Sequence, residues 1–271
     1  MNSPLTKLDA QAVREYRRNG PDCGLVNQQI QTISDYFRVI DSALTDNREF
    51  WFRGHSNSDY KLIPSALRFD SSQEKQAADN LLPHFKRLAQ LKIRKPPATD
   101  DHLSWSQHAQ HYGLYSRLLD WTQNAALALF FACGRQDTNG AVYILNPIDL
   151  NLLIDPKRPR IFNTDSDRDI IDVVLNVDGK RRKYSKEAIA IHPVWDSERI
   201  LLQRGVFTLH GPNNTGLDRN TASSLLCIPV LAKFKDKLLS ELDRIGICES
   251  SVFPELEHLC SYLKSRRNSF H

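Results

Sequence analysis

The amino-acid sequence predicts an α+β fold in which a helical N-terminal part packs on a strand-rich C-terminal part. Before residue 150, apolar side chains recur mainly at the three- and four-residue spacing of amphipathic helices. After residue 150, short apolar runs bounded by polar turns favour strands. The regular alternation of strand and helix that a doubly wound sheet requires is missing, which leaves α+β as the expected class.

The first half is expected to hold four helices and two strands. The aromatic run that ends at Gly54 is typical of a buried strand entering a turn. Asp120 and Gln123 have the spacing of a capping box, and the segment after them is apolar on every face, which predicts a helix at the centre of the core. The expected helices cover 28–45, 76–94, 103–112 and 125–133, and the expected strands cover 49–54 and 141–145.

The second half is expected to be mainly strands. An amphipathic surface helix is predicted over 233–242, and a last helix is predicted to start at Pro254, which suits a first helical turn. The expected strands lie near 169–176, 187–194, 199–209 and 224–230.

Composition is that of an ordinary globular protein, and the length allows one large domain or two small ones. Of the 271 residues, 41% are hydrophobic and 25% are charged, which is ordinary for a folded domain. We expect a lead at 1–28 and one domain at 29–271, with a motif-bearing core at 45–150 and a strand-rich remainder at 151–271. No run is long and apolar enough to span a bilayer, and the five cysteines form no disulfide pattern, so a cytoplasmic location away from membranes is expected.

Arg53 is the first candidate site residue, because an arginine at the end of an aromatic strand is costly to bury without a partner. Its guanidinium suits a phosphate or carboxylate, and Gly54 beside it would let a ligand approach the backbone. The alternative is a structural salt bridge to a carboxylate in the core.

The segment 111–122 is the densest polar and aromatic stretch of the chain. Backbone N–H groups at the start of the following helix would attract an anion, and aromatic rings in the segment could stack on a base. Each residue also has a structural interpretation, as a helix cap, an ion pair between Arg117 and Asp120, or core packing. The candidates in this segment are His111, Tyr112, Ser116, Arg117, Asp120 and Trp121.

Glu198 and Gln203 are candidates on the predicted strand at 199–209. A carboxylate at the mouth of a strand can stabilise an oxocarbenium-like centre, whereas Gln203 can only orient a ligand by hydrogen bonds. The alternative for Glu198 is a solvated charge at a strand end. No metal site is expected, since no histidine has a ligand spacing beside a carboxylate, and P-loop, Rossmann and GxSxG motifs are missing.

Five segments together resemble the FRG-domain family, named for its Phe/Tyr-Arg-Gly motif. The resemblance extends over about 45–265 and adds His55, Arg68 and Phe207 to the candidate site. Tyr115 and Ser116 stand where the family pattern has Pro-Thr. The matching segments are 50–55, 60–68, 109–122, 203–207 and 251–263.

A weaker resemblance is to ADP-ribosyltransferases, which implies a split sheet around a central cleft with NAD as substrate. It is carried by the aromatic-Arg-Gly strand, the hydroxyl segment before an Ala/Phe-rich helix and a late glutamate. The resemblance implies that Arg53 holds NAD, that Ser116 stands in the hydroxyl segment and that Glu198 stabilises the ribosyl cation.

These observations favour an NAD-dependent ADP-ribosyltransferase-like or NAD-cleaving protein, with a nucleotide ligand and no metal. A role as a toxin or in anti-phage defence would suit such an activity in a prokaryote. The acceptor, whether protein, nucleic acid or small molecule, is not indicated. The alternatives are a non-catalytic regulatory module that binds a nucleotide or nucleic acid, and a structural domain in which Arg53 and Asp120 only brace the core.

Overall fold

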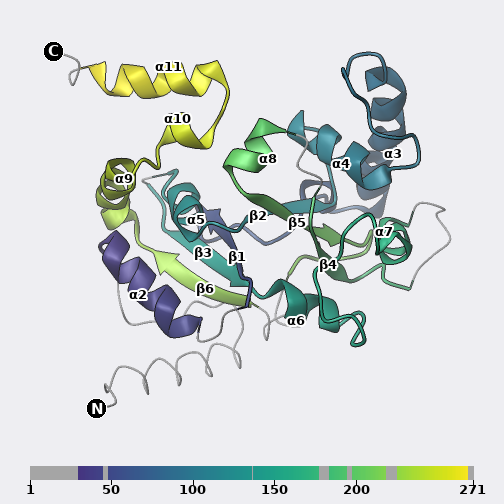
Figure 1. The fold of residues 1–271 in the computed structure, drawn as a ribbon, viewed down its shortest axis with the longest axis horizontal. Helices are drawn as coiled ribbons and strands as arrows, with labels where there is room; N and C mark the ends of the chain where they lie inside the picture. The colour runs from purple at the N-terminus through teal and green to yellow at the C-terminus, as the bar shows by residue number, and fades with distance from the viewer. Residues whose placement is uncertain are drawn as a thin grey trace.

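The computed structural model describes residues 30–44, 48–135, 137–176, 183–193, 197–217 and 225–267. Helices surround a single sheet, and the N-terminal and C-terminal helices lie toward the same side of the molecule (Figure 1). The predicted lead at 1–28 lies outside the described residues.

The sheet has six strands in the order β4-β5-β2-β1-β3-β6, and every neighbouring pair is antiparallel. This arrangement confirms the α+β class. The expected division into a helical first part and a strand-rich second part is wrong, because residues before 150 and residues after 150 each supply three strands to the one sheet. The strands are β1 (Trp51–His55), β2 (Leu118–Thr122), β3 (Gly140–Leu145), β4 (Ala188–Ile191), β5 (Gly205–His210) and β6 (Leu225–Val230).

Helices are interleaved with the strands along the whole chain. The helices are α2 (Ile33–Ala43), α3 (Ser72–Ala89), α4 (His102–His111), α5 (Ala125–Ala132), α6 (Pro147–Leu152), α7 (Arg168–Leu175), α8 (Glu198–Leu202), α9 (Lys235–Arg244), α10 (Glu249–Val252) and α11 (Leu256–Ser265), with short 3-10 turns at Ser65–Leu67 and Ala232–Phe234.

Strands β1 and β2 meet over a much shorter length than their neighbours do. Their register contains the pair Phe52↔Thr122, whereas β1 and β3 pair over five residues and β2 and β5 over five. The sheet is therefore continuous at its centre through one residue pair. Beyond that pair, the register of β1 and β2 contains no further backbone pairing.

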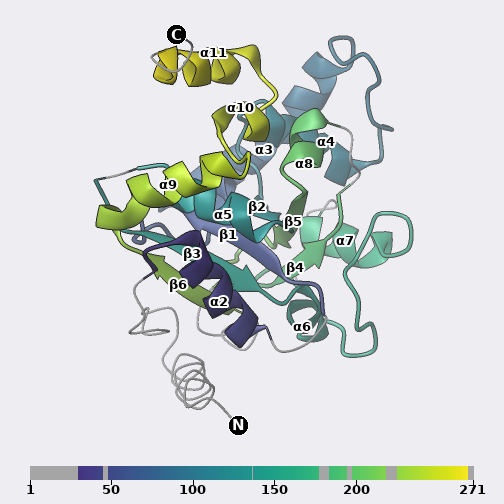
Figure 2. The same ribbon diagram turned by 60° about the vertical axis from the view of Figure 1, so that its left-hand side comes forward.

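Helix α5 packs directly on β1, and α2 and α9 cover the neighbouring part of the same face (Figure 2). The helix is apolar all round, as the sequence predicts, and most of its side chains are buried. Burying apolar surface at roughly 25 cal/mol per Å² makes this layer a main source of stability. Trp51, Trp121 and Val206 belong to a second core on the opposite face.

The predicted strand near 169–176 is wrong, and the one predicted over 199–209 is confirmed only from Gly205 onward. Residues 168–175 form helix α7, whose buried Ile170, Ile171 and Val174 have helical spacing. Residues 198–202 form helix α8, capped by Ser197, and the strand starts only at Gly205. Both segments are rich in residues that favour strands locally, and packing against the sheet overrides that preference.

Of the helices in the described ranges, none is both long and apolar enough to span a bilayer.

Candidate functional site

A cavity of about 900 Å³ lies between α4, α5 and α8, above the place where β1 and β2 part. We call it the central cavity. Its walls combine cations, carboxylates, amides and aromatic rings. The residues that line it include Phe52, Arg53, Gly54, His55, Lys61, Arg68, Phe69, Gln107, Gln110, His111, Asp120, Trp121, Thr122, Phe131, Arg199, Gln203 and Phe207.

The strand register explains why these residues meet. Residues paired across an antiparallel ladder share a face, as do residues two apart on one strand. The pairs Phe52↔Thr122 and Asp120↔Phe207 therefore place all four side chains on the face that carries the central cavity.

Arg53 reaches the cavity from the other face of β1. By alternation it lies on the opposite face from Phe52, yet its Nη1 donates to the backbone carbonyl of Asp120 at 2.5 Å. The separation of β1 from β2 leaves room for this contact. The guanidinium thus bridges the two strands beyond their one backbone pair, and 18% of the side chain stays exposed.

His55 fixes the orientation of Arg53. The Arg53 Nε donates to His55 Nε2 at 2.9 Å, and the His55 Nδ1 lies 3.1 Å from the carbonyl of Tyr60. Since Nε2 accepts, the ring is neutral with its proton on Nδ1, which donates to that carbonyl. Burial, helped by the positive charges of Arg53 and Arg68, lowers the pKa of His55 to about 3.

Asp120 is the carboxylate nearest to Arg53. Its Oδ2 lies 3.7 Å from the Arg53 Nη1, its Oδ1 accepts from Gln110 Nε2 at 2.6 Å, and 63% of the side chain is exposed. Burial lowers the pKa of Arg53, and the charge of Asp120 opposes that shift. The carboxylate is therefore held from two sides and still accessible from the cavity.

Further cations give this end of the cavity a positive character. Arg68 donates its Nε–H to the carbonyl of Ile63, and its charge acts on both Arg53 and His55. Lys61 and Arg199 also line the cavity, as do the carboxylates of Asp59 and Asp70. Clustered guanidinium groups next to an open volume suit a phosphate or carboxylate ligand.

Most of the sequence-predicted site residues border the central cavity, although their roles stay predictions. Trp121 lines the cavity as a residue of β2, but its side chain is buried in the core and its Nε1 donates to Thr208. It is therefore not placed to stack on a base. The predicted residues that line the cavity are Arg53, Gly54, His55, Arg68, His111, Asp120, Trp121, Gln203 and Phe207.

Four predicted residues lie elsewhere. Arg117 pairs with Asp79 rather than with Asp120, and it also donates to backbone carbonyls of α7 and β5. Ser116 is buried, and its Oγ accepts from the backbone of Leu118. Tyr112 is 69% exposed at the end of α4, and Glu198 is exposed at the start of α8.

The expected anion site at a helix start after Asp120 is wrong. Asp120 lies inside β2, and helix α5 begins after Asn124. The Asn124 side chain accepts from the first free N–H groups, of Ala126 and Leu127, so these donors already have a partner.

Gly54 has a packing role that the sequence does not show. A Cβ at this position would lie 1.9 Å from the carbonyl oxygen of Ala128 and 2.6 Å from the backbone nitrogen of Ala132. The missing side chain therefore lets α5 approach the backbone of β1. Gly54 also lines the central cavity, and its expected role toward a ligand stays a prediction.

Sequence reasoning missed Gln107 and Gln110, which lie three residues apart on α4 and both line the cavity. Gln107 is 3% exposed. The motif segment 109–122 includes Gln110, so that residue had a signal, whereas the burial of Gln107 emerges only from packing.

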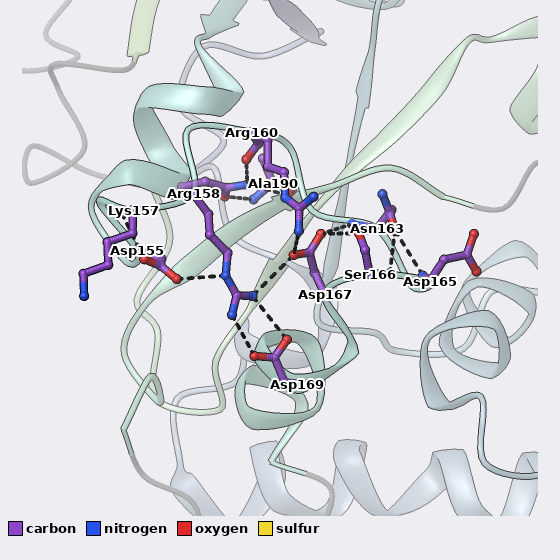
Figure 3. Close-up of polar contacts among 11 residues, drawn as sticks. Asp155, Lys157, Arg158, Arg160, Asn163, Asp165, Ser166, Asp167, Asp169 and Ala190 are labelled. Carbon is purple, nitrogen blue, oxygen red and sulfur yellow. Dashed lines mark hydrogen bonds and ion pairs between the residues drawn. The ribbon is translucent and has the colours of Figure 1, made fainter.

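A second polar cluster is formed by the segment between α6 and α7 and the start of α7, outside the residues that line the cavity. Asp167, whose side chain is 0% exposed, accepts from Arg160 Nη2 at 2.6 Å and from Arg158 Nη1 at 3.4 Å, and Asn163 and Ser166 supply further donors (Figure 3). Arg158 also pairs with Asp155 and Asp169. We call this group the Asp167 cluster.

The acidic residues of the Asp167 cluster are neutralised by arginines. Within the described part of the chain, no group of three or more His, Cys, Asp or Glu side chains is arranged to hold a metal ion.

Comparison with protein families gives one match. Residues 48–140 match the family model of the FRG domain; this range covers β1, β2, helices α3 to α5 and the Arg53 side of the cavity, and it ends at the first residue of β3. Residues beyond 140, including Gln203 and Phe207, lie outside the matched range. Searches of curated proteins and of solved structures gave no match.

Proposed function

Since this chain carries an FRG domain, we propose that its central cavity binds a nucleotide-like anion, with NAD as the candidate substrate. The observation that carries the proposal is the Arg53 guanidinium, held by His55 and the Asp120 carbonyl at the edge of an open cavity. A buried arginine oriented in this way can bind a phosphate without further ordering of its side chain.

Cleavage of NAD is the second part of the proposal, and the placement of Asp120 favours it. When the bond between ribose C1′ and the nicotinamide nitrogen breaks, its electron pair leaves with nicotinamide and positive charge develops on the ribose. A carboxylate beside that centre stabilises the charge. Water or an acceptor hydroxyl then attacks C1′ and loses a proton. We assign this role to Asp120, because Glu198 lies outside the residues that line the cavity.

The test is to incubate the purified full chain with NAD and to measure bound NAD by calorimetry and free nicotinamide by chromatography. Arg53→Ala removes a charge-assisted contact worth ~1.5–3 kcal/mol, so we expect NAD to bind about 10- to 100-fold more weakly. Asp120→Asn should retain binding but lose nicotinamide release by about 100-fold or more. Glu198→Gln, an exposed carboxylate outside the cavity, should do neither.

Each result separates the alternatives. Binding of NAD without release of nicotinamide would favour a non-catalytic nucleotide-binding module. If Glu198→Gln loses nicotinamide release and Asp120→Asn keeps it, the catalytic carboxylate is Glu198, as the sequence predicted, and not Asp120. Failure of the wild type to bind any nucleotide, with Arg53→Ala merely less stable, would contradict the proposal and leave Arg53 as a structural brace.

A further inference from the structure

Helix α4 contributes two glutamines to the wall of the central cavity. Gln107 and Gln110 both line the cavity. Gln107 is 97% buried, and its neighbours Trp105 and Ala109 are part of the buried interior. A primary amide in such a position normally has its hydrogen-bonding atoms paired.

In the described part of the chain, three of the four polar atoms of these two amides have no hydrogen-bond partner. Among the described residues, no group hydrogen-bonds to Gln107 Nε2 or Oε1, or to Gln110 Oε1. Gln110 Nε2 is used, since it donates to Asp120. A buried polar group without a partner destabilises the folded protein, so an unpaired donor and two unpaired acceptors beside one cavity require an explanation. A ligand that supplies the missing partners is that explanation.

The unpaired atoms define the chemistry of the ligand. Nε2 donates and Oε1 accepts, and both lie in the plane of one amide. Their complement is a planar group with a neighbouring acceptor and donor. A phosphate does not fit, because it offers only acceptors, which would repel Oε1. The Gln107 end of the cavity therefore differs from the Arg53 end.

We infer that Gln107 recognises a base of the ligand, either adenine or nicotinamide, by a paired donor–acceptor contact. This inference rests on the proposed nucleotide function. Two groups of a nucleotide such as NAD have this edge: the 6-amino group and N7 of adenine, and the carboxamide of nicotinamide. Glutamine forms such a bidentate contact with adenine in other settings. The two amide atoms have no accessible surface in this structure, so the side chain must rotate toward the ligand, and the rotation breaks no hydrogen bond.

The experiment compares two pairs of mononucleotides on wild type and Gln107→Leu by calorimetry. Inosine monophosphate differs from AMP in having an acceptor in place of the amino group. Nicotinic acid mononucleotide differs from nicotinamide mononucleotide in having a carboxylate in place of the amide. We expect the wild type to prefer one amino- or amide-bearing member by about 10- to 100-fold, and Gln107→Leu to lose that preference.

A stability measurement accompanies the binding measurement. Because leucine has a similar volume and no unpaired polar atoms, Gln107→Leu should raise the Tm of the free protein by about 2–4 °C or more. Gln76→Leu is the matched control, since Gln76 is exposed on α3 and its amide bonds to Asn80. The control should change neither nucleotide preference nor, by more than about 1 °C, the Tm.

Which nucleotide pair is discriminated identifies the group that Gln107 contacts. An unchanged preference in Gln107→Leu, or a fall in its Tm, overturns the inference while binding by the wild type keeps the proposed function. If the wild type binds none of the four nucleotides, both the proposed function and the inference fail.

Discussion

The Asp167 cluster and the central cavity both gather arginines, carboxylates and amides, but they differ in how completely those groups are paired. Asp167 is fully buried and accepts from two arginines, a backbone N–H and a hydroxyl. In the cavity, Asp120 is largely exposed and the Gln107 amide has no partner among the described residues. The groups of the Asp167 cluster are therefore paired within the fold, whereas the cavity has polar groups that could still pair with the ligand we propose.

The largest expected effect is at Gly54, where the cavity depends on the closeness of α5 to β1. Gly54→Ala places a Cβ 1.9 Å from the Ala128 carbonyl oxygen, and the helix must move away. We expect a loss of more than about 4 kcal/mol in the free energy of unfolding, measured by urea denaturation.

Gly134→Ala is the control for Gly54→Ala. Its Cβ would lie 3.4 Å from the nearest atom, so the cost should stay below about 1 kcal/mol. Equal stability of the two variants would show that α5 does not need the glycine of the Arg-Gly motif.

The next effect is the loss of stability in acid, to which two buried histidines contribute. His55 lines the cavity, and the His210 ring hydrogen-bonds to Thr208 and Asn214. Burial lowers the pKa of His55 to about 3 and that of His210 to about 4. The unfolded chain, with a histidine pKa near 6.5, binds more protons than the folded chain below that pH. The stabilisation by neutral histidine is therefore complete above pH 6.5 and lost as the pH falls toward the folded values.

Between pH 7.5 and pH 5 each of these histidines should lower the free energy of unfolding by about 2 kcal/mol. Urea denaturation across this range measures the loss. His55→Gln and His210→Gln should each reduce this loss by about 2 kcal/mol, whereas His84→Gln, exposed on α3, should not change it. A loss of the same size in His55→Gln as in the wild type would contradict the neutral ring assigned to His55.

Asp167→Asn tests the paired side of the comparison. The substitution keeps the shape of the side chain but removes the charge that Arg158 and Arg160 share. Because both arginines are partly exposed, we expect a loss of about 2 kcal/mol, less than for a fully buried pair. Nucleotide binding should be unchanged. A change in binding equal to that of Arg53→Ala would mean that the two regions are coupled.

Local sequence patterns predicted much of the sheet, but they failed where side-chain packing decides. The aromatic strand with Arg53 and the all-apolar helix after Asn124 were recognisable, since each carries one strong pattern. Helix α7 was predicted as a strand because Ile170, Ile171 and Val174 are residue types that favour strands locally. Their spacing fits a helical face only once the sheet is known.

The candidate site shows the same limit. Arg53 could be recognised in the sequence, because an arginine inside an aromatic strand is costly to bury without a partner. Gln107 has none, since a glutamine on a helix is usually solvated and only tertiary packing buries its amide. Asp120 was mistaken for a helix cap. It is a strand residue whose neighbours Arg53 and Gln110 belong to a different strand and to a helix.

The smallest expected effect on stability comes from Asp120→Asn, which makes in the cavity the same aspartate-to-asparagine change as Asp167→Asn. The side chain is 63% exposed, so the ion pair with Arg53 is screened by solvent, and an amide oxygen can still accept from Gln110. We expect the free energy of unfolding to change by less than about 0.5 kcal/mol in urea denaturation, against about 2 kcal/mol for Asp167→Asn. With nicotinamide release lost at nearly full stability, Asp120 would be reserved for the ligand. If Asp120→Asn instead destabilises the protein as much as Asp167→Asn does, the main role of Asp120 is to stabilise Arg53 in the folded protein. Asp120 would then belong with the groups that are paired within the fold, and the comparison with the Asp167 cluster would fail at this site.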